Sequence, residues 1–335
     1  GDNNAGVDDR SVRLGTAQPG EAPATFGDAL RRLSERATYL YVDGNRYWYS
    51  RRATISRTAA DRAASLNGQD VAAHIVSLLK EQRERGPFAG IHACPDDSAD
   101  VPDEPTVRLV ILPPDRIHAK GSKDSPGQQA AAEFLVRRGS GQRIHRNMLV
   151  FLAPDEARYA DLDKSVRDWM AWDSILKDQE SLNLPVSDIR LAETRRKRAE
   201  DAIAGRLKEA WSWLLVPEQE DATAEISWSA TRQQGTDALA VRAGRRMEQD
   251  GLLLTAMGAA NLKQRLDRYL WKETDHLSTA QLWSYFTLYL YLPRLADRDV
   301  LRGAIEAGVS QTVCDQLAYA GRYDEEVGRY EGLIT

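Results

Sequence analysis

The 335-residue chain has very few cysteines and no long apolar run. Cys94 and Cys314 are its only cysteines and form no C-x-x-C pair, which argues against a structural zinc site and is typical of a reducing compartment. The longest apolar stretch, at residues 282–292, is interrupted by polar residues and is shorter than the roughly 20 residues that span a bilayer. No signal peptide opens the chain. We therefore expect a cytoplasmic protein with no membrane partner.

The sequence also lacks the motifs of common catalytic sites. No G-x-x-x-x-G-K-[ST] loop is present, so this chain alone is not expected to bind ATP in the P-loop manner. Residues 139–144 lack the third glycine of a dinucleotide fingerprint. No H-E-x-x-H pair marks a metal site, and no G-x-S-x-G elbow marks a nucleophilic serine. A Ser-His-Asp arrangement assembled from distant positions stays open, but no residue pattern specifies a reaction.

Acidic and basic residues are nearly balanced in number. The chain has 45 Lys and Arg residues against 50 Asp and Glu residues, which gives a formal net charge of −5. This balance argues against coating a nucleic acid by bulk charge. A local basic face would still attract a polyanion, because the field near a surface depends on the charges of that face.

Residues 26–50 carry the most informative pattern. A short amphipathic segment that includes Leu30 leads into residues 39–49, where two aromatic-rich segments flank an Asp43-Gly44 turn. Asp-Gly between alternating β-forming residues is a strong hairpin signal, because Gly and Asp tolerate the positive φ of the turn. A winged-helix unit ends in this way, with a helix that leads into a hairpin.

Later segments predict a sheet and then helices. Continuous apolar runs at 88–93, 107–112 and 148–152, with helical spacing at 127–138, indicate a βαβ crossover and buried parallel strands. An apolar stripe predicts a helix that continues through Trp211 and Leu214 to Pro217. A short strand is expected at 224–229, and the chain closes on a second hairpin-like segment.

The predicted fold is therefore α+β and multi-domain. Its expected parts are a linker at 1–25, a winged-helix-like unit at 26–85, a small parallel α/β sheet domain at 86–155, and a mainly helical domain with a terminal β-hairpin at 156–335.

Basic residues gather around the first hairpin. Within residues 26–62, eight basic residues stand against four acidic ones, which reverses the sign of the whole chain. Arginine neutralises phosphates and releases counterions, and an aromatic side chain on a wing can stack on bases. A solvated helix face, with Arg stems covering apolar surface, would give the same pattern. The candidate nucleic-acid contacts are Arg31, Arg32, Arg36, Arg46, Trp48, Arg51 and Arg52.

An acidic segment follows the first predicted sheet strand. Clustered carboxylates at a strand end can hold a divalent metal ion for phosphoryl chemistry. Residues 106–113, however, lack the acidic residue, spacer and lysine expected after the Pro-Asp of a restriction-type nuclease. A solvated, proline-bounded loop is the simpler interpretation. The nearest approach to a metal site in this sequence is Asp96, Asp97, Asp100 and Asp103.

Aromatic residues are frequent in the predicted helical region. Their helical spacing favours a role in the core over a ligand cage, because aromatic rings bury large areas where helices cross. The residues concerned are Trp169, Trp172, Trp211, Trp213, Trp271, Trp283, Tyr285, Phe286, Tyr289 and Tyr291.

Five segments are distinctive in combination, at residues 39–49, 98–105, 147–155, 209–217 and 282–295. In this order they resemble the carboxy-terminal half of a family of large prokaryotic AAA-type P-loop ATPases, labelled a domain of unknown function. Members are often encoded in anti-phage defence islands beside DNA methyltransferases and helicases. The resemblance implies that ATP and Mg²⁺ bind to an upstream module, and that this chain is a segment of a longer protein. No position here matches the family's phosphate-binding residues.

The leading hypothesis is a non-catalytic accessory region of a defence-associated ATPase. Its expected partners are DNA, the upstream ATPase module and other defence proteins, and no cofactor is expected in this chain. One alternative is an oligomerisation or protein-interaction scaffold, in which hairpins pair between subunits of a homo-oligomer. A second alternative is a metal-dependent nuclease that uses the acidic loop.

Overall fold

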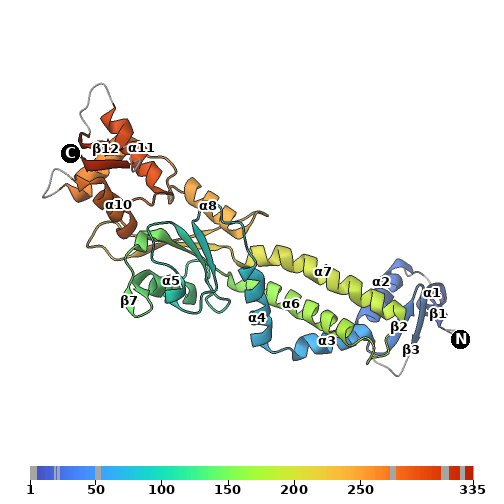
Figure 1. The fold of residues 1–335 in the computed structure, drawn as a ribbon. Helices are drawn as coiled ribbons and strands as arrows, with labels where there is room; N and C mark the ends of the chain where they lie inside the picture. The colour runs from blue at the N-terminus through green and yellow to red at the C-terminus, as the bar shows by residue number, and fades with distance from the viewer. Residues whose placement is uncertain are drawn as a thin grey trace. The chain divides into compact units, whose positions relative to one another are not determined.

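The computed structural model describes residues 6–18, 20, 23–49, 54–271, 277–310, 317–324 and 329–334. The fold is α+β, as predicted (Figure 1). It divides into two compact units, each built from two stretches of chain. Unit 1 comprises Gly1–Val71 and Asp163–Ala204, and unit 2 comprises Ala72–Leu162 and Gly205–Thr335. None of the described helices combines the length and the apolar character that crossing a membrane requires.

Unit 1 begins with a strand, two helices and a hairpin. These elements are β1 (Val7–Asp8), α1 (Asp9–Thr16), α2 (Pro23–Arg36), β2 (Leu40–Asp43) and β3 (Arg46–Tyr49). Strand β3 pairs antiparallel with both of the others, so the sheet order is β1-β3-β2. The predicted hairpin is confirmed, with its turn one residue later than expected. Asp43 still pairs with Arg46, and Gly44 takes the positive φ of +61°.

The predicted linker at 1–25 is wrong for the part that the structure describes, because β1 and α1 lie there. Asp8 caps α1 by accepting the Ser11 N–H at 3.0 Å, and Asp9 forms an ion pair with Arg13 within the helix. An aspartate at the N-cap satisfies a backbone N–H that the helix leaves unpaired. The Asp8-Asp9 pair was therefore a helix-start signal inside a segment whose composition resembled a linker.

Helices make up the rest of unit 1. They are α3 (Ile55–Ser65) together with the unit 1 portions of α4 (Gly68–Lys80), α6 (Glu156–Lys177) and α7 (Val186–Ala210). The core of this part contains Ile55, Ala59, Trp172, Ile175 and Ala192. Arg62 fixes α3 to α6 by donating to Ser174 Oγ at 2.9 Å and to Asp178 Oδ2 at 2.7 Å.

Unit 2 contains a five-stranded sheet with the order β10-β9-β8-β5-β4. Its strands are β4 (Gly90–Ala93), β5 (Arg108–Ile111), β8 (Leu149–Ala153), β9 (Trp213–Glu218) and β10 (Ser227–Arg232). Strands β4, β5 and β8 are parallel, and α5 (Pro126–Val136) lies between β5 and β8, which confirms the predicted βαβ crossover. Strands β9 and β10 then extend the sheet in antiparallel orientation.

The sheet is therefore mixed, and the prediction of a wholly parallel sheet is wrong. The predicted helix up to Pro217 is also wrong beyond Ala210, where α7 ends and β9 soon begins. Residues 213–217 are buried without interruption; all of them pair with β10, and residues 213–215 also pair with β8. In a central strand that is buried on both faces, nearly every residue is apolar, so polar and apolar residues do not alternate. Such a run also contains apolar residues at helical spacing, and the sequence alone does not distinguish the two structures.

Helix α5 covers one face of the sheet (Figure 1). Phe151 on β8 lies in the middle of this face and packs edge-on against Phe134 of α5 and Trp228 of β10. The buried cluster on this face contains Val101, Val110, Leu112, Ala130, Ala131, Phe134, Leu149, Phe151, Ala153, Trp213 and Leu215. Short elements bound it: the 3₁₀ turns η1 (Ser98–Asp100) and η2 (Arg146–Met148), and the ribbon β6 (Arg137–Arg138) and β7 (Gly141–Gln142).

The chain continues with helices and a second small sheet. The helices are α8 (Leu239–Gln249), α9 (Ala259–Arg265), the π-helix η3 (Leu266–Leu270), α10 (Thr279–Leu288) and α11 (Arg298–Val309). The strands are β11 (Leu277–Ser278), β12 (Tyr319–Asp324) and β13 (Arg329–Ile334), in the antiparallel order β11-β13-β12. The predicted terminal hairpin is thereby confirmed. Leu262, Leu266, Leu282, Phe286, Leu295, Leu301 and Ala304 are among the residues of their common core.

Three buried arginines hold the loops of unit 2. Each guanidinium donates to backbone carbonyls. Arg143 donates to the carbonyls of Ser98, Val101, Pro102 and Phe134. Arg242 donates to those of Lys208, Trp211 and Gly235, and Arg294 to those of Asn147, Pro217 and Leu252. Burial lowers the pKa of Arg294 to about 10, so the side chain stays protonated at neutral pH. We call these three side chains the arginine clamps.

Candidate functional site

The two ends of the chain share one order of elements. A short strand, two helices and a hairpin follow one another as β1-α1-α2-β2-β3 in unit 1 and as β11-α10-α11-β12-β13 in unit 2. In both sheets the last strand lies between the other two. The helix that directly precedes the hairpin is α2 at one end and α11 at the other. These two helices and the hairpins that follow them are candidate binding surfaces.

The outer face of α2 carries three of the predicted nucleic-acid contacts. Arg31, Arg32 and Arg36 are exposed, while Leu30 points into the interior. The helical period also places Asp28 and Glu35 on this outer face. Arg31 is already paired with Asp28, with Nη2 at 2.9 Å from Oδ1. The face therefore keeps an excess of one positive charge.

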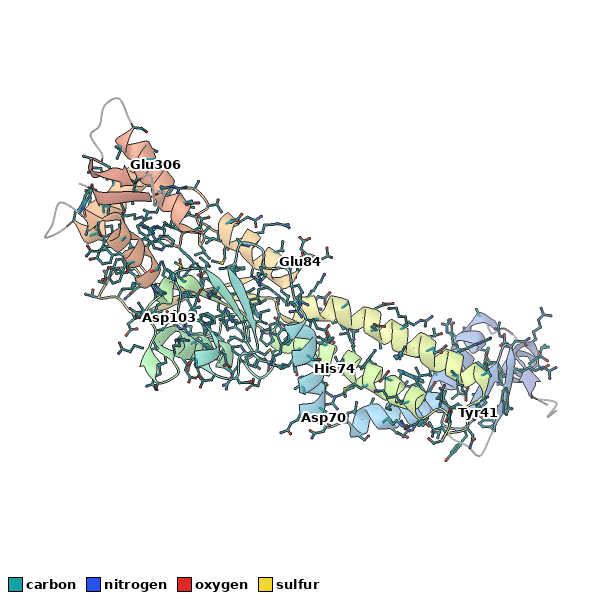
Figure 2. All side chains as sticks on the ribbon, in the orientation of Figure 1. Tyr41, Asp70, His74, Glu84, Asp103 and Glu306 are labelled. Carbon is teal, nitrogen blue, oxygen red and sulfur yellow. The ribbon has the colours of Figure 1, made fainter. Side chains whose placement is uncertain are left out.

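The hairpin places the other two described candidates differently. Arg46 is exposed at the turn. Trp48 is half-buried and stacks on Tyr41 of β2, which is labelled in Figure 2; the ring centroids are 5.8 Å apart and the ring planes differ by 22°. A Cβ at Gly6 would lie 3.3 Å from the Trp48 ring, so the indole also covers the chain before β1. Trp48 packs within the sheet and does not project as a wedge. Arg51 and Arg52 lie outside the described residues.

Apolar side chains occupy the opposite face of this small sheet. Val7 and Val42 both pair with Tyr47, so the three side chains form one row across the three strands. Val7 is 51% exposed and Val42 is 41% exposed; Tyr49, two residues beyond Tyr47, is 75% exposed. A single exposed apolar residue is common on protein surfaces and does not indicate a binding site, whereas a contiguous row of such residues marks a candidate contact surface.

The formal charge of the chain is not shared equally. Unit 1 contains eighteen basic and eighteen acidic residues, whereas unit 2 contains 27 basic and 32 acidic residues. The whole net charge of −5 therefore belongs to unit 2. The basic excess at 26–62 is offset by acidic residues elsewhere in unit 1, so any attraction for a polyanion depends on the α2 face and the hairpin.

The acidic loop uses its carboxylates internally. Asp97 caps η1 by accepting the Ala99 N–H at 2.7 Å, and Asp100 accepts the N–H groups of Asp96 and Asp97. Asp103, labelled in Figure 2, accepts from the N–H groups of residues 144 and 145 at 2.7 and 2.9 Å. Within the described parts of the chain, no group of three or more His, Cys, Asp or Glu residues is placed to hold a metal ion.

A serine, a histidine and an aspartate do come together at the carboxyl end of β8. His118 Nδ1 lies 2.7 Å from Ser125 Oγ, and Ser125 also caps α5 by accepting the Gln128 N–H. Asp155 is engaged by other groups: it accepts from Trp213 Nε1 at 3.0 Å and pairs with Arg232 at 3.3 Å. His118 packs edge-on against the Trp213 ring, with centroids 5.0 Å apart.

This cluster does not have the geometry of a catalytic triad. A triad histidine bonds the serine through one ring nitrogen and the carboxylate through the other. Here His118 Nε2 is buried and has no hydrogen-bond partner among the described residues. Burial lowers the pKa of His118, although the nearby Asp155 charge opposes this shift. Since Ser125 and His118 are almost fully buried, the cluster closes the end of the sheet and exposes no nucleophile.

Cys94 is equally unsuited to catalysis. It follows β4 with a positive φ of 47° and a buried side chain. Burial raises the pKa of its thiol to about 12, so the thiolate that nucleophilic attack requires is absent at neutral pH.

The aromatic residues of the helical region differ in burial. Trp172, Trp211, Trp213, Trp283 and Phe286 are buried, as predicted, whereas Trp169 and Trp271 are only half-buried. Four tyrosines instead form a half-exposed row, in which neighbouring rings contact each other in the order Tyr285, Tyr289, Tyr291, Tyr269. We call them the tyrosine row. The sequence reasoning missed this row because Tyr269 comes from the π-helix, and ring exposure cannot be read from spacing.

A comparison of this chain with protein-family models, with curated proteins and with solved structures finds no match.

Proposed function

We propose that this chain is a non-catalytic binding region of a larger, defence-associated P-loop ATPase, and that its β1-α1-α2-β2-β3 segment is a winged-helix unit that contacts DNA. The observation that supports the proposal best is the arrangement of that segment: the helix before the hairpin presents Arg31, Arg32 and Arg36, and the hairpin turn presents Arg46. The sequence resemblance supplies the context of an ATPase, and the chain itself has no phosphate-binding loop.

The likeness to a winged helix is topological. Such units place a helix in a groove of the duplex and a β-hairpin against the backbone beside it, so positive side chains on both elements face phosphates. On this reading α2 is the helix that lies against the duplex. The ion pair between Arg31 and Asp28 leaves Arg32 and Arg36 as the stronger phosphate contacts on the helix.

Salt-dependent DNA binding tests the proposal. The wild-type chain should bind a duplex of about 30 base pairs at about 50 mM salt and release it as the salt concentration rises, because counterions compete with Lys and Arg. The triple variant Arg31→Glu, Arg32→Glu, Arg36→Glu should bind much more weakly. It should also lower the slope of log affinity against log salt by about 2 to 3, or about one for each lost phosphate contact.

A matched control comes from another helix of the same unit. Arg190, Lys197 and Arg198 lie on the outer side of α7, and changing all three to Glu alters the charge of unit 1 by the same amount. If α2 is the contact, this control binds like the wild type. Absence of duplex binding by folded wild-type protein at low salt, or equal loss in both triple variants, would refute a DNA contact through α2.

The second candidate function is a protein-interaction scaffold. It is favoured by the exposed row of Val7, Tyr47 and Val42 and by the zero net charge of unit 1, since a neutral surface with contiguous apolar area suits a protein partner. Light scattering over a range of concentrations distinguishes the two. Concentration-dependent assembly that Val42→Glu abolishes supports a scaffold, and a monomer at every concentration counts against self-association.

A metal-dependent nuclease is not proposed. Asp97, Asp100 and Asp103 accept backbone N–H groups of their own loop and its neighbour. Moving them to coordinate an ion would break these bonds.

A further inference from the structure

The tyrosine row has a regular geometry. Ring centroids of Tyr285 and Tyr289 are 5.4 Å apart, those of Tyr289 and Tyr291 are 5.0 Å apart, and those of Tyr291 and Tyr269 are 5.0 Å apart. The planes of the middle pair differ by only 13°. Arg268 closes the row, with its Cζ 4.9 Å from the centroid of Tyr269.

The ring faces inside the row are already occupied. Tyr289 and Tyr291 each have a ring neighbour on two sides, and Arg268 lies over Tyr269. A nucleobase binds an aromatic side chain by stacking on an open face. The row offers ring edges and hydroxyl groups instead, which argues against single-stranded nucleic acid as its ligand.

The hydroxyl groups of the row are not equivalent. Tyr269 donates to the Glu220 carbonyl at 3.2 Å, and Tyr285 accepts from Gln281 Nε2 at 2.5 Å. Among the described residues, the hydroxyls of Tyr289 and Tyr291 make no comparable bond, and both side chains are half-exposed. Burial and the neighbouring tyrosines raise the pKa of Tyr291 to about 12, so this hydroxyl keeps its proton and remains a donor.

Acidic residues flank the row. The bond from Tyr269 fixes it beside the loop between β9 and β10, where Glu220, Asp221 and Glu225 are exposed. Hydrogen bonds from Thr223 and Ala224 lower the pKa of Asp221, and the charge of Arg268 adds a smaller contribution. Arg268 offsets part of the acidic charge, but the three carboxylates of the loop outnumber this one guanidinium. Unit 2 as a whole is also acidic. A ligand at the row therefore gains from positive charge at its end.

We propose that the tyrosine row is a docking site for a proline-rich peptide segment that carries Arg or Lys beside its prolines. A polyproline II segment has no internal hydrogen bonds, and proline has no N–H, so such a ligand presents carbonyl acceptors and compact apolar rings. The hydroxyls of Tyr289 and Tyr291, which have no partner among the described residues, supply donors for the carbonyls, and the proline rings pack against the exposed ring edges of the row. Clusters of aromatic side chains are a recurring way to bind proline-rich segments. The carboxylates of the neighbouring loop then select the basic flank.

Fluorescence polarisation tests this site without reference to the DNA contact. The probe is a labelled peptide of about ten residues, prolines flanked by arginines, long enough to span several turns of polyproline II. We expect saturable binding by the wild-type chain, and weaker binding when the prolines are replaced by serines or the arginines by glutamates. The double variant Glu220→Gln, Glu225→Gln should lose affinity mainly for the arginine-flanked peptide.

Two tyrosine variants keep the test independent of folding. The pair Tyr289→Phe and Tyr291→Phe preserves the rings and removes the two free hydroxyls, and it should weaken binding about tenfold, as expected for two lost hydrogen bonds. Tyr269→Phe is the matched control, because its only hydroxyl proton is already donated to the Glu220 carbonyl and is not available to the peptide. Binding that is unchanged in the double variant overturns the proposal. So does an absence of saturable binding by folded wild-type protein, or preference for an oligothymidylate over the peptide.

Discussion

A single added methyl group at Gly244 should destabilise unit 2. Gly244 lies in the interior of α8 and is buried. A Cβ at this position would lie 2.3 Å from both Cδ and Cγ of Pro87, more than 1 Å inside the ordinary contact distance of about 3.5 Å. Pro87 cannot turn aside easily, because its ring fixes φ and the preceding Gly86 holds a positive φ against the same helix.

Two effects of opposite sign decide the magnitude. Replacing Gly by Ala in a helix interior stabilises by about 1 kcal/mol. Overpacking a tight contact costs about 1 to 3 kcal/mol, and the rigid partner places Gly244→Ala at the upper end of this range. We expect the free energy of unfolding to fall by about 1 to 2 kcal/mol in urea titrations, with an unchanged m-value.

Gly303 provides the matched control. It lies in the interior of α11, is exposed, and has no atom within 4 Å of an added Cβ. Gly303→Ala should therefore stabilise unit 2 by about 0.5 to 1 kcal/mol through helix propensity alone. If Gly244→Ala is as stable as the wild type or gains as much as Gly303→Ala, the close approach between Pro87 and α8 is not real.

Three further predictions concern polar side chains of unit 2. Burial lowers the pKa of His118 in the folded protein, so the unfolded chain takes up a proton at this residue first as the pH falls below about 6.5. The folded state should therefore lose stability below that pH. In thermal unfolding, the loss of stability between pH 7.5 and 5.5 should be smaller for His118→Gln than for the wild type. An equal decline in both proteins would contradict this. Asp103→Asn should lower the free energy of unfolding by about 1 to 3 kcal/mol, since one amide oxygen replaces two carboxylate oxygens that accept N–H groups. An unchanged free energy of unfolding in urea titrations would show that these bonds contribute nothing. Arg294→Met should lower the free energy of unfolding by about 2 to 4 kcal/mol, because it leaves three backbone carbonyls unpaired, and Arg294→Lys should lower it by less. If urea titrations give the reverse order, the guanidinium bonds do not stabilise the loops.

Local sequence signals were sufficient for the elements whose pattern has a single interpretation. The Asp43-Gly44 pair and the aromatic alternation around it predicted the first hairpin, and the apolar runs ending near Ile111 and Leu152 predicted two buried parallel strands. Strand β9 was assigned to a helix because Trp211 and Leu214 continue the stripe of α7. Only the pairing with β8 and β10, which residues far away in sequence decide, makes the segment a strand.

The candidate sites were harder to predict for the same reason. Arg31, Arg32 and Arg36 were recognised as basic, but the ion pair with Asp28 and the stacking of Trp48 on Tyr41 depend on side-chain geometry. The sequence favoured a solvated acidic loop over a metal site, but it could not show that Asp97, Asp100 and Asp103 accept backbone N–H groups. The tyrosine row joins residues of the π-helix and of the α10 region, and no local pattern links them.

The arginine clamps bind main-chain oxygens, which every amino-acid type carries. These contacts by themselves therefore place no demand on the side chains of the residues that supply the carbonyls, whereas they do require the three arginines. A library that randomises the clamped loops while keeping Arg143, Arg242 and Arg294 should retain many folded members. The clamped loops of unit 2 should therefore keep their backbone conformation when their exposed side chains are replaced.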